Sequence, residues 1–221
     1  MSIHPQVRVV VRPYGSAIPL GFFAFGIGMF LYAALDAPWV KATDAHSLGL
    51  LLTGFVAPLE IVAAVFAFLA RDTVAGATLG LFAGSWFVAG LTTMQAKPGQ
   101  LDASVGYFLI AFTIVVVLLG SAAVFGKPFI AVLLGVSAVR ALLSAIYQLG
   151  GGVGWNHVGG WLALGIFCVA MYGGIAFLLE DMLGRTLLPL GRRGGSRQAM
   201  EGDLEEQLQG LADEAGVRHT L

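Results

Sequence analysis

The sequence predicts an all-α polytopic membrane protein with six transmembrane helices. The first observation is composition, because 57% of the 221 residues are hydrophobic and only 11% are charged, whereas soluble domains carry about 25% charged residues. The second is mean hydropathy, which is +0.85 over the whole chain. The third is that the apolar residues fall into six runs, each close to the ~20 residues that cross ~30 Å of hydrocarbon.

The first apolar run begins with Pro19, which suits a helix start because its φ is fixed and it lacks an N–H. A 3.6-residue period places Gly21, Ala24, Phe25 and Gly28 on one face. Small residues at this spacing let helices approach closely in a bilayer. Phe25 is the bulky exception, and two interpretations stay open: packing within the membrane, or a side chain that points into a pathway between helices.

The six runs divide the chain into three parts. We expect an N-terminal cytoplasmic arm over residues 1–17, a six-helix membrane domain over 18–180 and a cytoplasmic tail over 181–221. A glycine-rich loop over residues 150–157 is expected before the last helix. The predicted helices cover residues 18–35, 48–70, 74–93, 105–125, 129–149 and 160–179.

Lysine and arginine are distributed unequally between the two sides of this arrangement. One side holds only Lys41 and Lys97. The other side holds Arg8, Arg12, Arg71, Lys127, Arg185, Arg192, Arg193 and Arg197. Because basic residues concentrate in cytoplasmic loops, we expect a plasma-membrane protein with both termini in the cytoplasm.

The tail allows two interpretations. Met200, Leu204, Leu208 and Leu211 recur at helical spacing among acidic residues, which indicates a short amphipathic helix that packs on a neighbouring subunit. A disordered charged tail fits the same composition equally well.

Two ionisable residues lie deep in the predicted spans, Glu60 in the second and Arg140 in the fifth. Each costs ~2.5–3.5 kcal/mol on the insertion scale if it faces lipid. Such residues therefore need a partner or water. The two helices run in opposite directions and place both residues near one depth, so Glu60 and Arg140 could pair. A pathway role for each residue is the other interpretation, and both stay open.

Arg140 belongs to a polar stripe on the fifth predicted helix. Val136, Ser137, Arg140, Ser144 and Tyr147 share one face at spacings of three and four residues. Such a stripe faces a water-filled cavity or a polar seam between helices. Phe82 and Ser85 define the expected interior face of the third helix.

The sequence offers no motif for an enzyme, a cofactor or a metal. HExxH, GxSxG, a Walker loop and paired cysteines are all missing, and Cys168 is the single cysteine. His46 and His157 fall near the ends of outer loops and are interpreted as interfacial. A basic patch for nucleic acid is also missing.

Several short segments resemble the acetate uptake transporter (succinate–acetate permease) family. Pro19-Leu20-Gly21 followed by Phe25-Gly26 is similar to the family's N-terminal signature. Residues 71–78, with Trp86, resemble its next conserved segment, and residues 184–191, Gly-Arg-Thr-Leu-Leu-Pro-Leu-Gly, resemble the bacterial C-terminal motif. The resemblance implies a six-helix protomer in a hexamer that moves acetate, and in some members succinate, together with protons.

The resemblance also implies an apolar constriction, which falls on Phe25, Phe82 and Val136 of this chain. Phe82 replaces a family tyrosine and Val136 a family leucine. Glu60 stands where many members have glutamine, Tyr147 where bacterial members often have asparagine, and Arg140 on a usually apolar position. These differences bear on substrate and coupling.

We therefore expect a transporter or channel for small monocarboxylates, with acetate as the first candidate. Arg140 would supply a charge to the anion, and Ser137 and Ser144 would orient it. Glu60 would carry the coupled proton or neutralise Arg140 when the site is empty. Two alternatives stay open: a passive pore for ammonia, urea or undissociated acid, and a membrane subunit or sensor that transports nothing.

The topology is directly testable. Reporters fused at Met1 and at Leu221 should respond alike, because six spans return the chain to the side on which it started. A cysteine introduced at Lys97 should be labelled from outside intact cells. Opposite responses from the two termini would contradict the six-span prediction.

Overall fold

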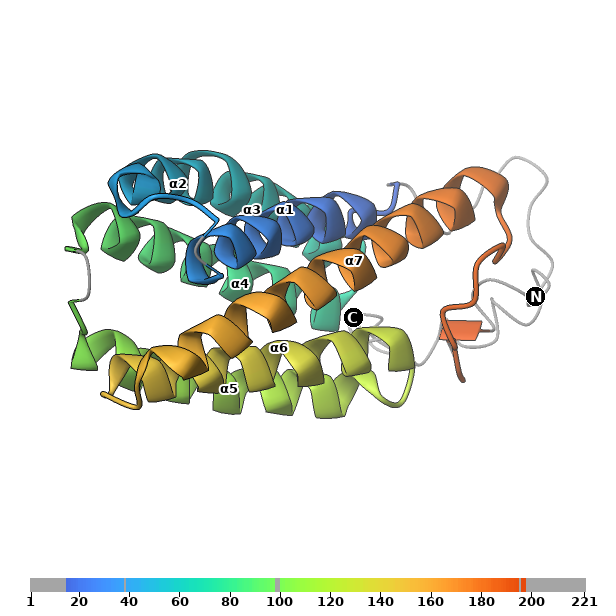
Figure 1. Ribbon diagram of the computed structural model, residues 1–221. Helices are drawn as coiled ribbons and strands as arrows, with labels where there is room; N and C mark the ends of the chain where they lie inside the picture. The colour runs from blue at the N-terminus through green and yellow to red at the C-terminus, as the bar shows by residue number, and fades with distance from the viewer. Residues whose placement is uncertain (1–14, 38, 98–99, 195, 198–221) are drawn as a thin grey trace, which may run out of the picture.

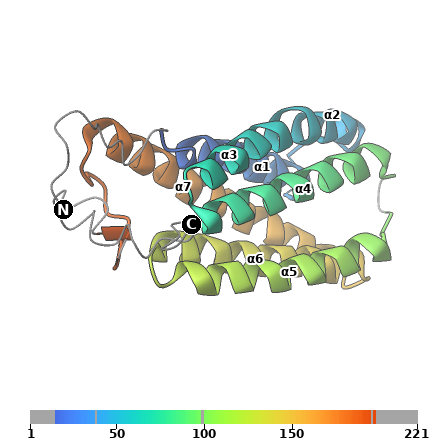
Figure 2. The same cartoon turned by 180° about the vertical axis from the view of Figure 1, so that it is seen from behind.

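The computed structural model describes residues 15–37, 39–97, 100–194 and 196–197. The regular secondary structure of these residues consists of helices, which short turns and loops connect (Figures 1 and 2). Arg8 and Arg12 of the predicted arm lie outside the described residues. The predicted amphipathic helix with Met200, Leu204, Leu208 and Leu211 lies outside them as well.

Among the described residues, six helical segments are long and apolar enough to cross a membrane, as the sequence predicted. Pro19 stands in the first turn of the first one, as predicted. The spans are α1 (Ile18–Asp36), the α2–α3 segment (Ala45–Leu69), α4 (Thr73–Gln95), α5 (Ala103–Ala123), α6 (Pro128–Gln148) and α7 (Val153–Leu183).

The second span is interrupted, whereas the sequence predicted one continuous helix. A 3₁₀ turn, η1 (Ala42–Asp44), leads into α2 (Ala45–Leu51), and the π-helical turn η2 (Leu52–Val56) separates α2 from α3 (Ala57–Leu69). Pro58 in the first turn of α3 has no N–H to donate to the carbonyl four residues earlier, which favours a local widening. Glu60 follows directly, in the first turn of α3.

The last helix is longer than predicted at both ends. The chain turns at Gly150 and Gly152, with φ of 97° and 90°, and α7 begins at Val153. The prediction of a loop over residues 150–157 was therefore wrong for its second half. The helix ends at Gly184, whose left-handed φ of 63° suits a residue without Cβ. At ~1.5 Å per residue α7 is about 46 Å long, and it crosses the other helices obliquely (Figure 1).

The helices pack in pairs. α5 lies along α6, α3 lies along α4, and α1 packs most extensively on α7. α4 and α5 touch only slightly, which leaves space between the two pairs. Small residues make the close contacts: Gly173 and Gly174 of α7 face the rings of Phe22 and Phe23. On the predicted small-residue face of α1, Gly28 faces the Trp86 ring of α4.

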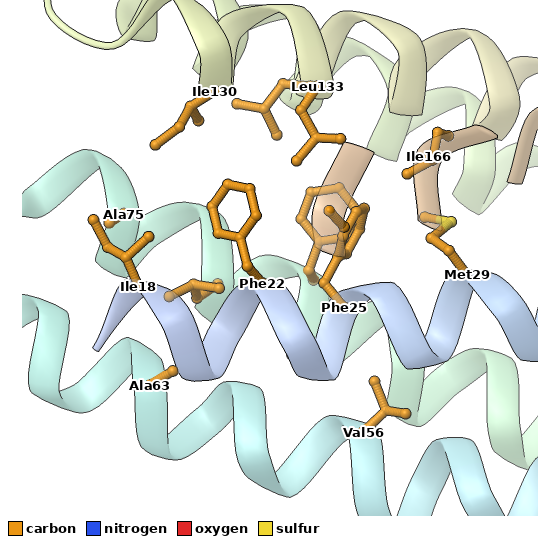
Figure 3. Close-up of a cluster of buried hydrophobic side chains, with 14 of the residues drawn as sticks. Ile18, Phe22, Phe25, Met29, Val56, Ala63, Ala75, Ile130, Leu133 and Ile166 are labelled. Atoms are coloured by element: carbon orange, nitrogen blue, oxygen red, sulfur yellow. The ribbon is translucent and has the colours of Figure 1, made fainter. Parts of the chain in front are cut away.

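The bundle has two different ends. We call the end where α1 begins and α7 finishes the terminal end, and the opposite end, where α4 finishes and α5 begins, the vestibule end. Apolar side chains fill the terminal half, where Phe22 and Phe25 project from α1 toward Ile130 and Leu133 of α6 (Figure 3). The space between α1 and α6 is therefore closed in that half.

Residues after α7 fold back onto the terminal end. The Tyr172 hydroxyl donates to the carbonyl of Pro189 at 3.0 Å, and Leu190 is buried. Arg192 forms an ion pair with the buried Glu180 and lies over the Phe177 ring. Part of the segment predicted as a cytoplasmic tail thus packs against the helices.

Candidate functional site

A cavity of about 560 Å³ enters the bundle from the vestibule end. Exposed residues such as Lys97 and Asp102 form its rim. Its walls come from α1, α4, α5, α6 and α7, and its inner part reaches Phe82 and Ser137. The polar stripe predicted on α6 lines it: Ser137, Arg140, Ser144 and Tyr147 all face the cavity, and so does Ser85 of α4.

Arg140 pairs with Asp36, the last residue of α1. Arg140 Nη2 donates to Asp36 Oδ2 at 2.8 Å, and the side chains are only 7% and 8% exposed. The pairing of Arg140 with Glu60, which the sequence left open, is not formed: Glu60 accepts from Trp86 instead. The first predicted helix ended at residue 35, whereas α1 extends to Asp36, whose side chain is buried in the bundle.

The carboxylate of Asp36 is held by a second partner from α7. Asn156 Nδ2 donates to Asp36 Oδ1 at 3.2 Å. Gly160, one turn farther along α7, lies so close to α1 that a Cβ there would be 2.9 Å from the Cβ of Asp36. The early start of α7 is what brings Asn156 to this position.

The sequence did contain a signal for Asp36. Phe25, Met29, Tyr32 and Asp36 recur at spacings of four, three and four residues, which places them on one face of α1. Met29, Tyr32 and Asp36 all line the cavity. Asn156 carried no comparable signal, because its stretch was interpreted as a loop.

An aromatic network connects Arg140 to Glu60. The guanidinium lies 3.9 Å from the centroid of the Tyr32 ring, a cation–π contact. The Tyr32 ring packs on Trp86 with a centroid separation of 5.4 Å. Trp86 Nε1 donates to Glu60 Oε1 at 2.9 Å. Glu60 itself is fully buried and is not part of the cavity wall, since Trp86 presents its ring there instead.

Three buried polar atoms in this region lack a hydrogen-bond partner among the described residues: Arg140 Nε, Ser144 Oγ and Glu60 Oε2. Ser144 follows Arg140 by one helical turn, so both lie on the same face of α6. Ser137 differs, because its hydroxyl already donates to the carbonyl of Leu133 at 2.8 Å. Of the two serines expected to orient a substrate, Ser144 is the one with an unused donor.

Two of the three predicted constriction residues touch each other. The rings of Phe25 and Phe82 meet edge to face at 5.0 Å, and Phe112 of α5 packs on the other side of Phe82 at 5.1 Å. Phe82 lines the cavity, whereas Phe25 lies behind it in the apolar core. Val136 is partly buried against the same core.

His46 and His157 both lie at the vestibule end. His46 is exposed in α2, with its Nδ1 3.4 Å from the carbonyl oxygen of Met94. His157 is exposed in the first part of α7 and thus stands in a helix.

Comparison with solved structures decides the fold. The fold is that of the bacterial acetate channel SatP. The two structures superpose with a TM-score of 0.70 over 80% of this chain and 99% of SatP, at 19% sequence identity. No protein-family model matches the chain, and no curated protein matches it. The likeness to SatP agrees with the family resemblance noted in the sequence, and at this identity it establishes the architecture.

The Asp36–Arg140 pair predicts strong coupling in stability. Arg140→Leu alone strands a buried carboxylate and should cost ~3–5 kcal/mol of unfolding free energy in a dry site, less in a wet one. Adding Asp36→Asn should recover much of that loss, because no lone charge remains. The measurement is a double-mutant cycle by unfolding in detergent micelles.

The control for this cycle is the Glu60–Arg140 pair that the sequence left open. Glu60→Gln combined with Arg140→Leu should show the smaller coupling, because Glu60 reaches Arg140 only through two aromatic rings. A larger coupling for Glu60 than for Asp36 would contradict the observed pairing.

Proposed function

We propose that the protein is a membrane channel or transporter for small monocarboxylates, with acetate as the first candidate, and that it belongs to the acetate uptake transporter family. The observation that carries the proposal is the cavity itself. It leads from one end of the bundle to a buried guanidinium and stops against an apolar pair of rings. This is the arrangement of a pathway captured with one end open, in a fold shared with an acetate channel.

The inner part of the cavity has a polar region, which we call the floor and which consists of Asp36, Arg140 and Ser144. This floor and the neighbouring apolar rings have complementary roles in the proposal. Arg140 and Ser144 supply donors to the oxygen atoms of a carboxyl group, with Tyr147 farther toward the rim. Phe25 and Phe82 then exclude water and large solutes, with Val136 as the third member of the constriction. Glu60 contributes to the pathway as the residue that holds Trp86 in the wall.

Orientation and assembly are finer parts of the proposal. Among the described residues, Arg71, Lys127, Arg185, Arg192, Arg193 and Arg197 lie toward the terminal end, and Lys41 and Lys97 toward the vestibule end. This distribution favours a cytoplasmic terminal end in the plasma membrane. Proton coupling, succinate as a second substrate and a hexamer are carried over from the family resemblance.

Uptake of labelled acetate into proteoliposomes tests the function. Flux should exceed that of protein-free liposomes, and an inward proton gradient should increase it if transport is coupled.

Ser85→Trp should reduce the flux by filling the cavity with a bulky ring. Ser121→Trp is the matched control, because Ser121 also donates to its own helix but is exposed on α5. Equal flux with and without protein would contradict the proposal.

The constriction makes a separate prediction about solute size. Phe25→Ala removes one ring of the edge-to-face pair and should admit monocarboxylates larger than acetate. Phe22→Ala is the control, since Phe22 is similarly buried but packs on Phe129 and Phe177. The measurement is relative uptake of acetate, butyrate and hexanoate. If both variants fold and Phe25→Ala keeps the original size profile, Phe25 serves packing alone.

A further inference from the structure

We propose that the floor of the cavity selects neutral solutes that present a hydrogen-bond donor beside an acceptor. Undissociated carboxylic acids and short primary amides share this chemistry. The inference rests on the proposed function, because it takes the cavity to be part of the transport pathway. It goes further by stating which form of a carboxylate crosses and by adding a class of uncharged cargo.

The balance of charge at the floor disfavours an anion. Arg140 is the only cation at the floor among the described residues, and Asp36 neutralises it at 2.8 Å. The other charged lining residues, Lys97 and Asp102, are exposed at the rim. An entering anion would therefore give the floor a net negative charge in a poorly solvated site, where charge is costly. A neutral solute leaves the pair balanced.

The side chains at the floor have both hydrogen-bond donors and acceptors that are not used. An ionised carboxylate offers about four acceptor positions. Asp36 uses one for Arg140 and one for Asn156. Arg140 Nε and Ser144 Oγ are buried donors without a partner in the described part of the chain. The floor thus offers unused acceptors and unused donors together, and a –COOH or –CONH₂ group presents the matching donor and acceptor.

The contacts around the Asp36–Arg140 pair restrict its movement. An anion would gain from this site if Arg140 could leave Asp36 and turn toward it. The Tyr32 ring covers the guanidinium at 3.9 Å, and Asn156 holds the carboxylate from the other side. The close approach of Gly160 to Asp36 leaves the end of α1 little room to move. The pair is therefore held together, which favours a solute that binds without breaking it.

Acetamide is the probe that separates the two forms of cargo, because it has the shape of acetic acid but does not ionise. Its entry into proteoliposomes is followed by stopped-flow light scattering against protein-free vesicles. Acetate current across planar bilayers that contain the protein measures the anion. The expected result is protein-dependent acetamide flux with no acetate current above background.

Asp36→Asn tests the origin of the selectivity. The change keeps the size of the side chain but leaves Arg140 uncompensated. Acetate current should therefore rise to about tenfold above background, and acetamide flux should fall about tenfold. Asp44→Asn is the matched control: it removes the same charge from an exposed residue that does not line the cavity, and asparagine suits the helix start at which Asp44 precedes α2. That variant should behave like the original protein.

A double variant covers the case in which Asp36→Asn does not fold. Asp36→Asn with Arg140→Gln removes both charges, keeps polar groups at both positions and should still pass acetamide without acetate current. Acetate current in the unmodified protein with acetamide excluded would overturn the inference while leaving the proposed function in place. Absence of both acetamide flux and protein-dependent uptake of labelled acetate would overturn both.

Discussion

One requirement constrains the whole vestibule end of this bundle: the buried guanidinium of Arg140 needs a counter-charge. Arg140 lies in the middle of α6, where an unpaired cation would be strongly unfavourable. The Asp36 carboxylate satisfies it only because α1 continues to that residue and α7 approaches it through Gly160 and Asn156. One ion pair and one hydrogen bond thus join three helices at Asp36.

The aromatic side chains extend this constraint across the bundle. Tyr32 stacks on Arg140, Trp86 packs on Tyr32, and Glu60 accepts the indole N–H. The series links α6, α1, α4 and α3 through contacts that each restrict a ring. It also explains how a carboxyl group such as Glu60 is accommodated deep in the membrane without lining the cavity.

The likeness to SatP at 19% identity shows that very different sequences adopt this architecture. Glycines at helix contacts, such as Gly173 and Gly174 against Phe22 and Phe23, allow close packing with many different neighbours. Arg140 and Asp36 join two helices in another way, through a buried ion pair. The same bundle can therefore carry different chemistry at the floor of its cavity, which makes that chemistry the place to look for what this chain transports.

The sequence by itself determined the six spans, the uneven distribution of basic residues and the polar face of α6, because composition and helical periodicity are local properties. It also placed Phe25 and Phe82 together, although only through the family resemblance. Only the tertiary structure decided that Arg140 meets Asp36 and that Glu60 meets Trp86. Periodicity tells which residues share a face of one helix, but not which faces of two helices meet. That choice depends on where α1 ends, where α7 begins and how closely a glycine lets them approach.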